Sequence, residues 1–231
     1  MERIIKSNNY KLKNHSKIKE IKILQGKNNF PITWLKTQGY CEYILYLEHC
    51  KNIIAQPTQS MITGSKEDEK LGSPFQKKAK KKKIKSGTLE DLLKDSKKEI
   101  TITRYVFVLS TEFGIRGFID EIQMSPDDIK IINDKSGKIA YKSSINQALA
   151  YALAFKSMVN DDRKISIAIR ERGTDNIIFS DTFDENKEKE IIYLINRVHG
   201  LFNGIKPFIP TKNKNKCNKC RFKSYCEHYS N

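Results

Sequence analysis

The sequence lacks any long apolar segment. Its 231 residues contain no run that approaches the ~18 apolar residues needed for a membrane-spanning helix. The amino terminus, Met-Glu-Arg-Ile-Ile-Lys, has no apolar stretch of the kind found in a signal peptide. We therefore expect a soluble, cytoplasmic protein without a membrane partner.

Acidic residues are scarce relative to basic ones. The chain has 43 Lys and Arg against 27 Asp and Glu, which gives a net charge of +16. A charge of this size favours a polyanionic partner, with nucleic acid first and an anionic membrane second. Seven lysines lie within residues 77–85. This run is predicted to be a solvated loop or helix extension, with a phosphate-binding arm as the second interpretation and a nuclear localisation signal as the third.

Cysteine is infrequent and odd in number, with five residues in a chain that has no secretion signal. This argues against a framework of disulfides. The two-residue gap between Cys217 and Cys220 can bring two thiolates to one metal, and Cys226 adds a third. The fourth ligand must come from elsewhere in the chain. In order of preference, the candidates are Cys41, Cys50 and His228.

The identity of the metal depends on that fourth ligand. Local ligands alone would favour zinc. A remote cysteine favours an iron–sulfur cluster that connects residues 41–50 with residues 210–228.

Strand and helix patterns alternate along the chain. Strands are predicted at residues 104–110, 115–124, 129–135, 164–170 and 176–181, and helices at 34–38, 40–47, 88–98, 144–158 and 185–202. The helix at 144–158 is apolar almost all round, which predicts burial against a sheet. This order indicates a mixed α/β fold in a single domain over residues 1–231, without an internal repeat.

Residues 115–124 and 129–135 are predicted to form a hairpin through a Ser-Pro-Asp-Asp turn. A symmetric turn places Asp120 opposite Asn133, about 5 Å apart at Cβ, with Lys135 one diagonal step away on the same face. A carboxylate, a second oxygen ligand and a lysine on one face are the groups that a metal-dependent phosphodiesterase uses. An ordinary surface hairpin is the alternative interpretation.

Six short motifs follow one another along the chain. They are Gly39-Tyr40-Cys41-Glu42-Tyr43, Met61-Ile62-Thr63-Gly64, Gly117-Phe118-Ile119-Asp120-Glu121, Ile131-Ile132-Asn133-Asp134-Lys135, Gln147-Ala148-Leu149-Ala150-Tyr151 and the Cys217/Cys220/Cys226 tail. Each motif alone is weak, but their order and the split cysteine set are much more specific. From about Cys41 to Cys226, the chain resembles the CRISPR-associated RecB-type exonuclease family. This family is a branch of the PD-(D/E)XK nucleases that carries a four-iron cluster.

The resemblance implies a RecB-like core, with a mixed central sheet flanked by helices and an amino-terminal helical segment joined to the cysteine tail by the metal cluster. It implies that Asp120 binds Mg²⁺ or Mn²⁺, that Lys135 is catalytic, and that Gln147 and Tyr151 contact DNA or support the site. The ligands of a [4Fe–4S] cluster would be Cys41, Cys217, Cys220 and Cys226.

The function implied by the resemblance is a DNA exonuclease that acts on single strands or frayed ends. It would trim prespacers in CRISPR adaptation beside the integrase. A homo-oligomer is compatible with the sequence.

Two positions depart from the family's pattern. Asp68 stands where the family usually has a histidine metal ligand, and aspartate is a hard oxygen ligand suited to the same ions. Asn133 stands where Asp or Glu is usual, and a neutral amide binds a cation more weakly. Asp134 could replace it only if a bulge rotates the strand, because adjacent residues point to opposite faces.

These departures keep two other functions open. One is a catalytically weakened iron–sulfur relative that binds DNA or a partner. The other is a zinc-bound nucleic-acid-binding protein.

Overall fold

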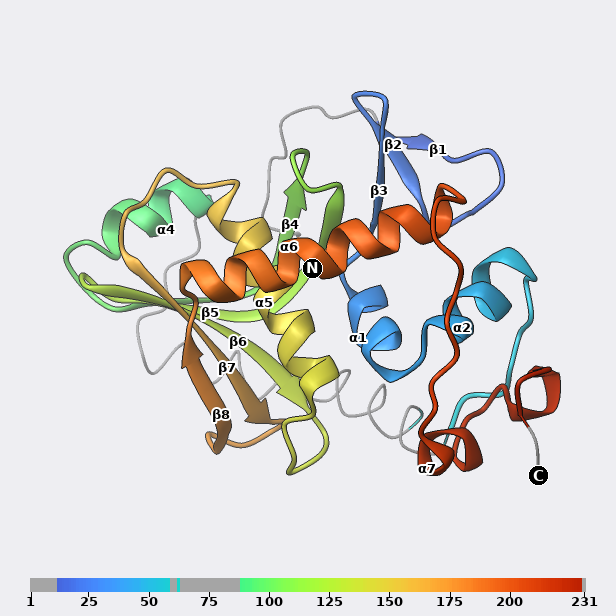
Figure 1. The fold of residues 1–231 in the computed structure, drawn as a ribbon. Helices are drawn as coiled ribbons and strands as arrows, with labels where there is room; N and C mark the ends of the chain where they lie inside the picture. The colour runs from blue at the N-terminus through green and yellow to red at the C-terminus, as the bar shows by residue number, and fades with distance from the viewer. Residues whose placement is uncertain (1–11, 59–61, 63–87, 230–231) are drawn as a thin grey trace.

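Eight strands form one mixed sheet in the computed structural model, which describes residues 12–58, 62 and 88–229 (Figure 1). The predicted mixed α/β fold, with a central sheet flanked by helices, is confirmed. Asp68, the lysine run at 77–85 and most of the Met61–Gly64 motif lie outside the described residues. No helix in the described ranges has the length and apolar character to cross a membrane.

The strands follow the chain closely. They are β1 (Lys13–Asn14), β2 (Lys22–Leu24), β3 (Lys27–Pro31), β4 (Thr101–Ser110), β5 (Ile115–Met124), β6 (Asp128–Lys135), β7 (Lys164–Glu171) and β8 (Ile177–Thr182). Strands β4 to β8 lie side by side in sequence order, and all neighbours among them are antiparallel except β6 and β7. Strand β3 runs parallel to the beginning of β5 and connects β1 and β2 to the sheet.

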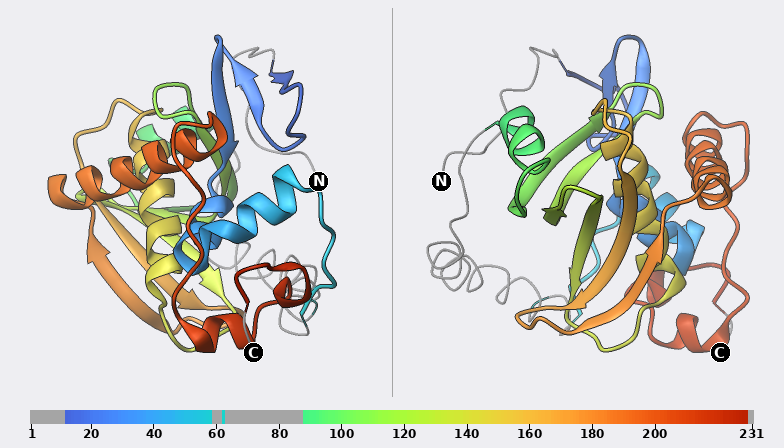
Figure 2. Two further views of the ribbon diagram at one scale, coloured as in Figure 1. Left: turned by 45° about the vertical axis from the view of Figure 1, so that its right-hand side comes forward. Right: turned by 90° about the vertical axis from the view of Figure 1, so that its left-hand side faces the viewer.

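The helices surround this sheet. They are α1 (Thr33–Tyr40), α2 (Glu42–Leu45), the π-helical turn η1 (Tyr46–Cys50), α4 (Leu89–Asp95), α5 (Lys142–Lys156), α6 (Glu185–Phe202), α7 (Lys214–Asn218) and the 3₁₀ turn η2 (Lys223–Tyr225). Helix α5 crosses one face of the sheet, and α6 lies outside α5 on the same side (Figure 2). The predicted bounds of α6 are confirmed, while α4 and α5 each end two or three residues earlier than predicted.

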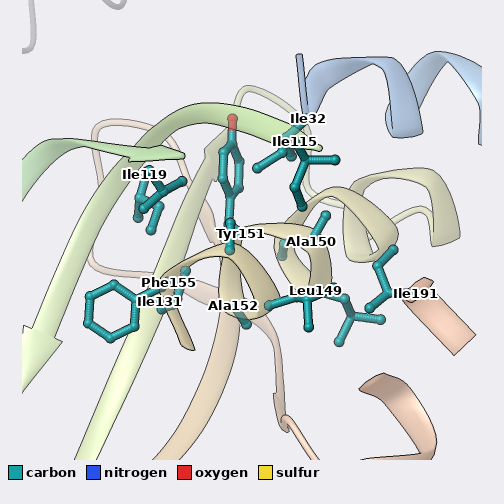
Figure 3. Close-up of a cluster of buried hydrophobic side chains, with 14 of the residues drawn as sticks. Ile32, Ile115, Ile119, Ile131, Leu149, Ala150, Tyr151, Ala152, Phe155 and Ile191 are labelled. Atoms are coloured by element: carbon teal, nitrogen blue, oxygen red, sulfur yellow. The ribbon is translucent and has the colours of Figure 1, made fainter. Parts of the chain in front are cut away.

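Helix α5 connects the parallel strands β6 and β7, which requires a crossover over one face of the sheet. Its predicted burial is confirmed, because Ser144 and residues 146–155 are all buried. The alanines in this stretch let the helix backbone come close to the strands. Figure 3 shows Tyr151 projecting from α5 between Ile119 and Ile115 of β5.

The predicted hairpin of β5 and β6 is confirmed. The Ser125 N–H donates to the Asp128 carbonyl at 2.8 Å, and the Asp128 N–H donates to Ser125 Oγ at 3.0 Å. The register pairs Glu121 with Ile132, and the ladder ends there. Continued by one step, the same register places Asp120 opposite Asn133, as the sequence predicts.

Strand β5 changes phase at Asp120. Ile119 and Ile122 are both 0% exposed in the same core, although residues three apart in a regular strand point to opposite faces. On the neighbouring strand, Tyr105 has a φ of +54°, and the register passes from Arg104↔Glu121 to Val106↔Ile119. Asp120 lies at this irregularity, one residue beyond the last pair of the β5–β6 ladder, Glu121↔Ile132.

The amino-terminal part differs from the sequence prediction in two respects. Three short strands lie within residues 13–31, ahead of the first predicted strand at 104–110. The predicted helix at 40–47 is interrupted, because Cys41 is extended (φ −167°, ψ 120°) and separates α1 from α2. The interruption turns the Cys41 side chain toward the carboxy-terminal tail, whose Thr211 N–H lies 3.3 Å from Cys41 Sγ.

The carboxy-terminal tail packs against α2 and η1. Phe222 is 0% exposed in a small core that also contains Tyr43 and Leu47. Arg221 Nη2 lies 2.7 Å from Glu48 Oε1, which adds an ion pair to the contact. These two regions are thus connected by packing and an ion pair, while the predicted connection through a metal cluster stays a prediction. Among residues 12–58, 62 and 88–229, no three His, Cys, Asp or Glu side chains are arranged to hold a metal ion.

Candidate active site

Three predicted residues form a hydrogen-bonded chain over the sheet. Lys135 Nζ, at the end of β6, donates to Gln147 Oε1 of α5 at 2.9 Å. Gln147 Nε2 donates to the Tyr151 hydroxyl at 3.4 Å, one helical turn further along α5. Gln147 and Tyr151 are 4% and 5% exposed, so these bonds fix their positions with little competition from water.

Asp120 lies beside this chain. Its Oδ2 accepts the main-chain N–H of Asp134 at 2.8 Å, a bond from side chain to backbone where the ladder has ended. Burial raises the pKa of the Asp120 carboxyl, and the charge of Lys135 opposes that rise. A carboxylate in such a place remains ionised only with the help of a cation or of hydrogen bonds.

Two further cations, which the sequence did not single out, accompany Lys135. Burial, followed by the positive charge of Lys36 on α1, lowers the pKa of Lys135 from 10.5 to about 8. Burial also lowers the pKa of Lys36, and the charge of Arg172 lowers it further. The main-chain N–H of Arg172 donates to the main-chain carbonyl of Lys135 at 2.9 Å, because β6 and β7 end side by side. These three residues form the cationic group Lys36/Lys135/Arg172.

Gly39 is the one sequence feature that could have indicated the position of Lys36. Gly39 follows it by three residues on α1, and a Cβ at Gly39 would lie 2.9 Å from Ser143 Cβ at the start of α5. Only glycine permits this approach of the two helices. Residues three apart share a helix face, so Lys36 lies on the side of α1 that meets α5.

Asn133 fits a site that binds a cation through oxygen ligands. It is 1% exposed, and its Nδ2 has no hydrogen-bond partner in the described part of the chain. A buried N–H donor of this kind would be satisfied by a water or by an oxygen of a bound ligand, while the amide oxygen of the same side chain would bind the cation. Together with Asp120, Asn133 offers one carboxylate and one amide, which are ligands suited to Mg²⁺ or Mn²⁺.

Asp134 does not lie with these groups. Its Oδ2 accepts from Arg104 Nη2 at 2.6 Å and its Oδ1 from Arg170 Nε at 2.8 Å, on the face of the sheet opposite α5. Glu121 is on that same face and accepts from Arg170 Nη1 at 2.8 Å. A bulge that would rotate Asp134 toward the Asp120 face is absent from β6, which pairs with β7 in one unbroken register from Asp128 to Lys135. Asp134 therefore does not take the place of Asn133 as a metal ligand, and the prediction of Asp134 as a ligand is corrected.

The predicted cluster ligands form a second group, away from the first. One pocket is lined by Cys41, Cys217, Cys220 and Cys226, and also by His228. Burial raises the pKa of the Cys220 thiol, and the other three thiols raise it further.

Backbone groups of the tail approach two of these sulfurs. Cys220 Sγ accepts the Phe222 N–H at 3.4 Å and Cys41 Sγ accepts that of Thr211 at 3.3 Å. Cys50 is exposed and is not among the lining residues.

One family model and two solved structures show similarity to this chain. None of the curated proteins matches the chain. A putative exonuclease from Eubacterium rectale is 13% identical, with a TM-score of 0.44, and the match covers 88% of this chain and 90% of that one. The solved structure of SSO0001 is 15% identical, with a TM-score of 0.39 and coverage of 90% and 91%. The family model described as the PD-(D/E)XK nuclease superfamily matches residues 47–227, which include every candidate residue except Lys36, Cys41 and His228. The chain therefore belongs to the PD-(D/E)XK nuclease superfamily.

Proposed function

We propose that this protein is a divalent-metal-dependent DNA exonuclease that acts on single strands or frayed ends. The observation that carries the proposal is the chain of hydrogen bonds from Lys135 through Gln147 to Tyr151, beside the Asp120 carboxylate. A lysine held in place next to a partly buried carboxylate suits phosphodiester hydrolysis, in which charge develops on the phosphoryl oxygens. The net charge of +16 favours a nucleic acid substrate.

In this proposal Asp120 and Asn133 hold Mg²⁺ or Mn²⁺, and Asp68 is a further candidate ligand outside the described residues. When bound, the cation supplies a Lewis acid and a water of lowered pKa. Lys135, with a pKa of about 8, is mostly protonated at neutral pH and donates to a phosphoryl oxygen. Gln147 fixes the direction of that donation.

The cationic group Lys36/Lys135/Arg172 binds the phosphates of the DNA strand. Lys135 and Arg172 act electrostatically on the Asp120 carboxylate and Lys36 acts on Lys135, so three positive charges in this part of the structure outnumber the charge of Asp120. A group of positive charges raises the local concentration of a polyanion and its rate of association.

A second function is favoured by Asn133. A neutral amide in place of a carboxylate lowers the affinity for a divalent cation. On this alternative the chain is a catalytically weakened relative that binds DNA or a partner through its basic surface.

The pocket lined by Cys41, Cys217, Cys220 and Cys226 is proposed to hold a [4Fe–4S] cluster. The four thiols match the ligand number of such a cluster. Because the cluster is larger than one ion, its ligands need not approach as closely as those of zinc. The N–H donors toward Cys41 and Cys220 Sγ suit sulfurs that carry negative charge.

The biological role that we propose is the trimming of prespacers in CRISPR adaptation, beside an integrase. Its support is the ordered series of motifs from Cys41 to Cys226 together with the pocket shared by the cysteines.

The test is the degradation of end-labelled single-stranded DNA with Mn²⁺ by anaerobically purified protein, compared with Lys135→Ala. We expect the wild-type protein to shorten the strand and Lys135→Ala to lose at least about 100-fold in rate. Salt-sensitive binding of DNA without cleavage by either protein would contradict the exonuclease and support the binding function. Asn133→Asp measures how far the amide limits activity, and a large rise in rate would indicate a weakened metal site.

A further inference from the structure

Four buried charges form a network beneath the candidate active site, one from each of four neighbouring strands. They are Arg104 of β4, Glu121 of β5, Asp134 of β6 and Arg170 of β7. Arg170 bonds Glu121 and Asp134 at 2.8 Å each, and Arg104 Nη2 bonds Asp134 at 2.6 Å. Their side chains are only 3–9% exposed. Two positive and two negative charges balance one another, so the network is neutral.

Arg104 differs from Arg170 in what else it contacts. Its Nε donates to the main-chain carbonyl of Asp120 at 3.2 Å, while Nη2 bonds the Asp134 carboxylate. One guanidinium therefore connects β5 and β6 just beyond the last pair of their ladder, Glu121↔Ile132. In this same place the Asp134 N–H donates to Asp120 Oδ2.

We propose that Arg104 is a positioning residue for the proposed metal site. It holds the Asp120 main chain and the Asp134 side chain at a fixed separation, so that the Asp134 N–H orients the Asp120 carboxylate toward the cation. This inference rests on the proposed function for the role of Asp120 as a metal ligand. The hydrogen bonds themselves are independent of that role.

The network accounts for the charged residues that are buried on the face of the sheet opposite the candidate catalytic groups. Ladder hydrogen bonds keep two antiparallel strands in register, but they are missing at Asp120. Arg170 also connects the two strands, through Glu121 and Asp134, whereas Arg104 bonds the main chain of Asp120 itself. Without these bonds, the two strands could separate there and the carboxylate could rotate. Partners that orient a metal ligand typically change metal affinity or activity by about 10- to 100-fold when they are removed.

The first measurement is Mn²⁺ affinity by calorimetry, on the full-length protein without DNA. We expect Arg104→Gln to raise the Mn²⁺ Kd by about 10- to 100-fold, and Arg104→Lys to raise it less. In cleavage assays the variants should need more Mn²⁺ for half-maximal rate, while the rate at saturating Mn²⁺ recovers. Wild-type Mn²⁺ affinity in a folded Arg104→Gln or Arg104→Lys protein would overturn the inference.

Arg163→Gln is the matched control. The Arg163 side chain is 9% exposed, bonds the Asp161 carboxylate at 2.7 Å and donates to the Ser125 carbonyl at 2.6 Å, in the turn at the other end of the same hairpin. It should lower thermal stability to a similar degree and leave the Mn²⁺ Kd unchanged. An equal loss of Mn²⁺ affinity in this control would mean that Arg104 acts only through general stability.

A second measurement separates the inference from the proposed function. Hydrogen–deuterium exchange by mass spectrometry follows peptides that contain Asp134, whose N–H is protected by Asp120 Oδ2. The Arg104 variants should exchange this amide faster than wild-type protein and Arg163→Gln do. If wild-type protein and Asp120→Ala bind Mn²⁺ equally, the proposed function fails, and this exchange then decides only whether Arg104 holds the hydrogen bond between the Asp134 N–H and Asp120 Oδ2. Unchanged exchange in both Arg104 variants would overturn it.

Discussion

Replacement of Lys135 by methionine should stabilise the fold while it abolishes nuclease activity. Burial and the charge of Lys36 lower the pKa of Lys135 from 10.5 to about 8. Each pKa unit corresponds to about 1.4 kcal/mol, so the charged lysine destabilises the folded state by about 3 kcal/mol at neutral pH. Methionine fills similar space without the charge. The loss of the bond to Gln147 offsets about 1 kcal/mol of this gain.

The sign of the effect sets its pH dependence. Below about pH 8 the lysine is charged in both the folded and the unfolded protein, so the full penalty is present. As the pH rises from 8 toward 10.5, the folded protein releases the proton first and the penalty disappears. The stability advantage of Lys135→Met should therefore shrink by about 2 kcal/mol between about pH 7 and about pH 10.

Urea unfolding under anaerobic conditions at these two pH values measures the difference. Lys138→Met replaces an exposed lysine three residues away and controls for the loss of a lysine as such. A Lys135→Met protein that is less stable than wild type by the same amount at both pH values would refute the assignment of a buried, destabilising charge to Lys135.

Two further substitutions test the surroundings of the two sites. At Gly117 a Cβ would lie 2.8 Å from Cε1 of Tyr151, so Gly117→Ala should displace the tyrosine and lower kcat by about 10- to 100-fold. Gly137→Ala, with nothing within 4 Å of its Cβ, should leave kcat unchanged; equal rates in both variants would contradict a supporting role for the tyrosine. Cys217→Ser should remove most of the iron bound per chain, whereas Cys50→Ser, outside the pocket, should retain it. Wild-type iron content in Cys217→Ser, or one zinc per chain in its place, would refute the proposed cluster.

The order of elements was accessible from the sequence because it depends on local periodicity. Alternation and turn chemistry predicted the β5–β6 hairpin and its register, and the amphipathic pattern predicted α6 from Glu185 to Phe202. The register in turn placed Asp120 and Asn133 in line. The grouping of distant cysteines was predicted because two thiols in a short motif require further ligands from elsewhere.

The neighbours of the candidate catalytic groups were decided only by tertiary structure. Lys36 reaches the site because α1 packs on α5, and Arg172 does so because two parallel strands end together. Local sequence carries no record of such contacts between distant segments. The same holds for Asp134, since alternation predicts which face a carboxylate occupies but not the partners that it meets there. On that face Arg104 of β4 and Arg170 of β7 neutralise the Asp134 carboxylate. Its charge therefore helps to hold the strands together, and Asp134 does not join Asp120 at the candidate active site.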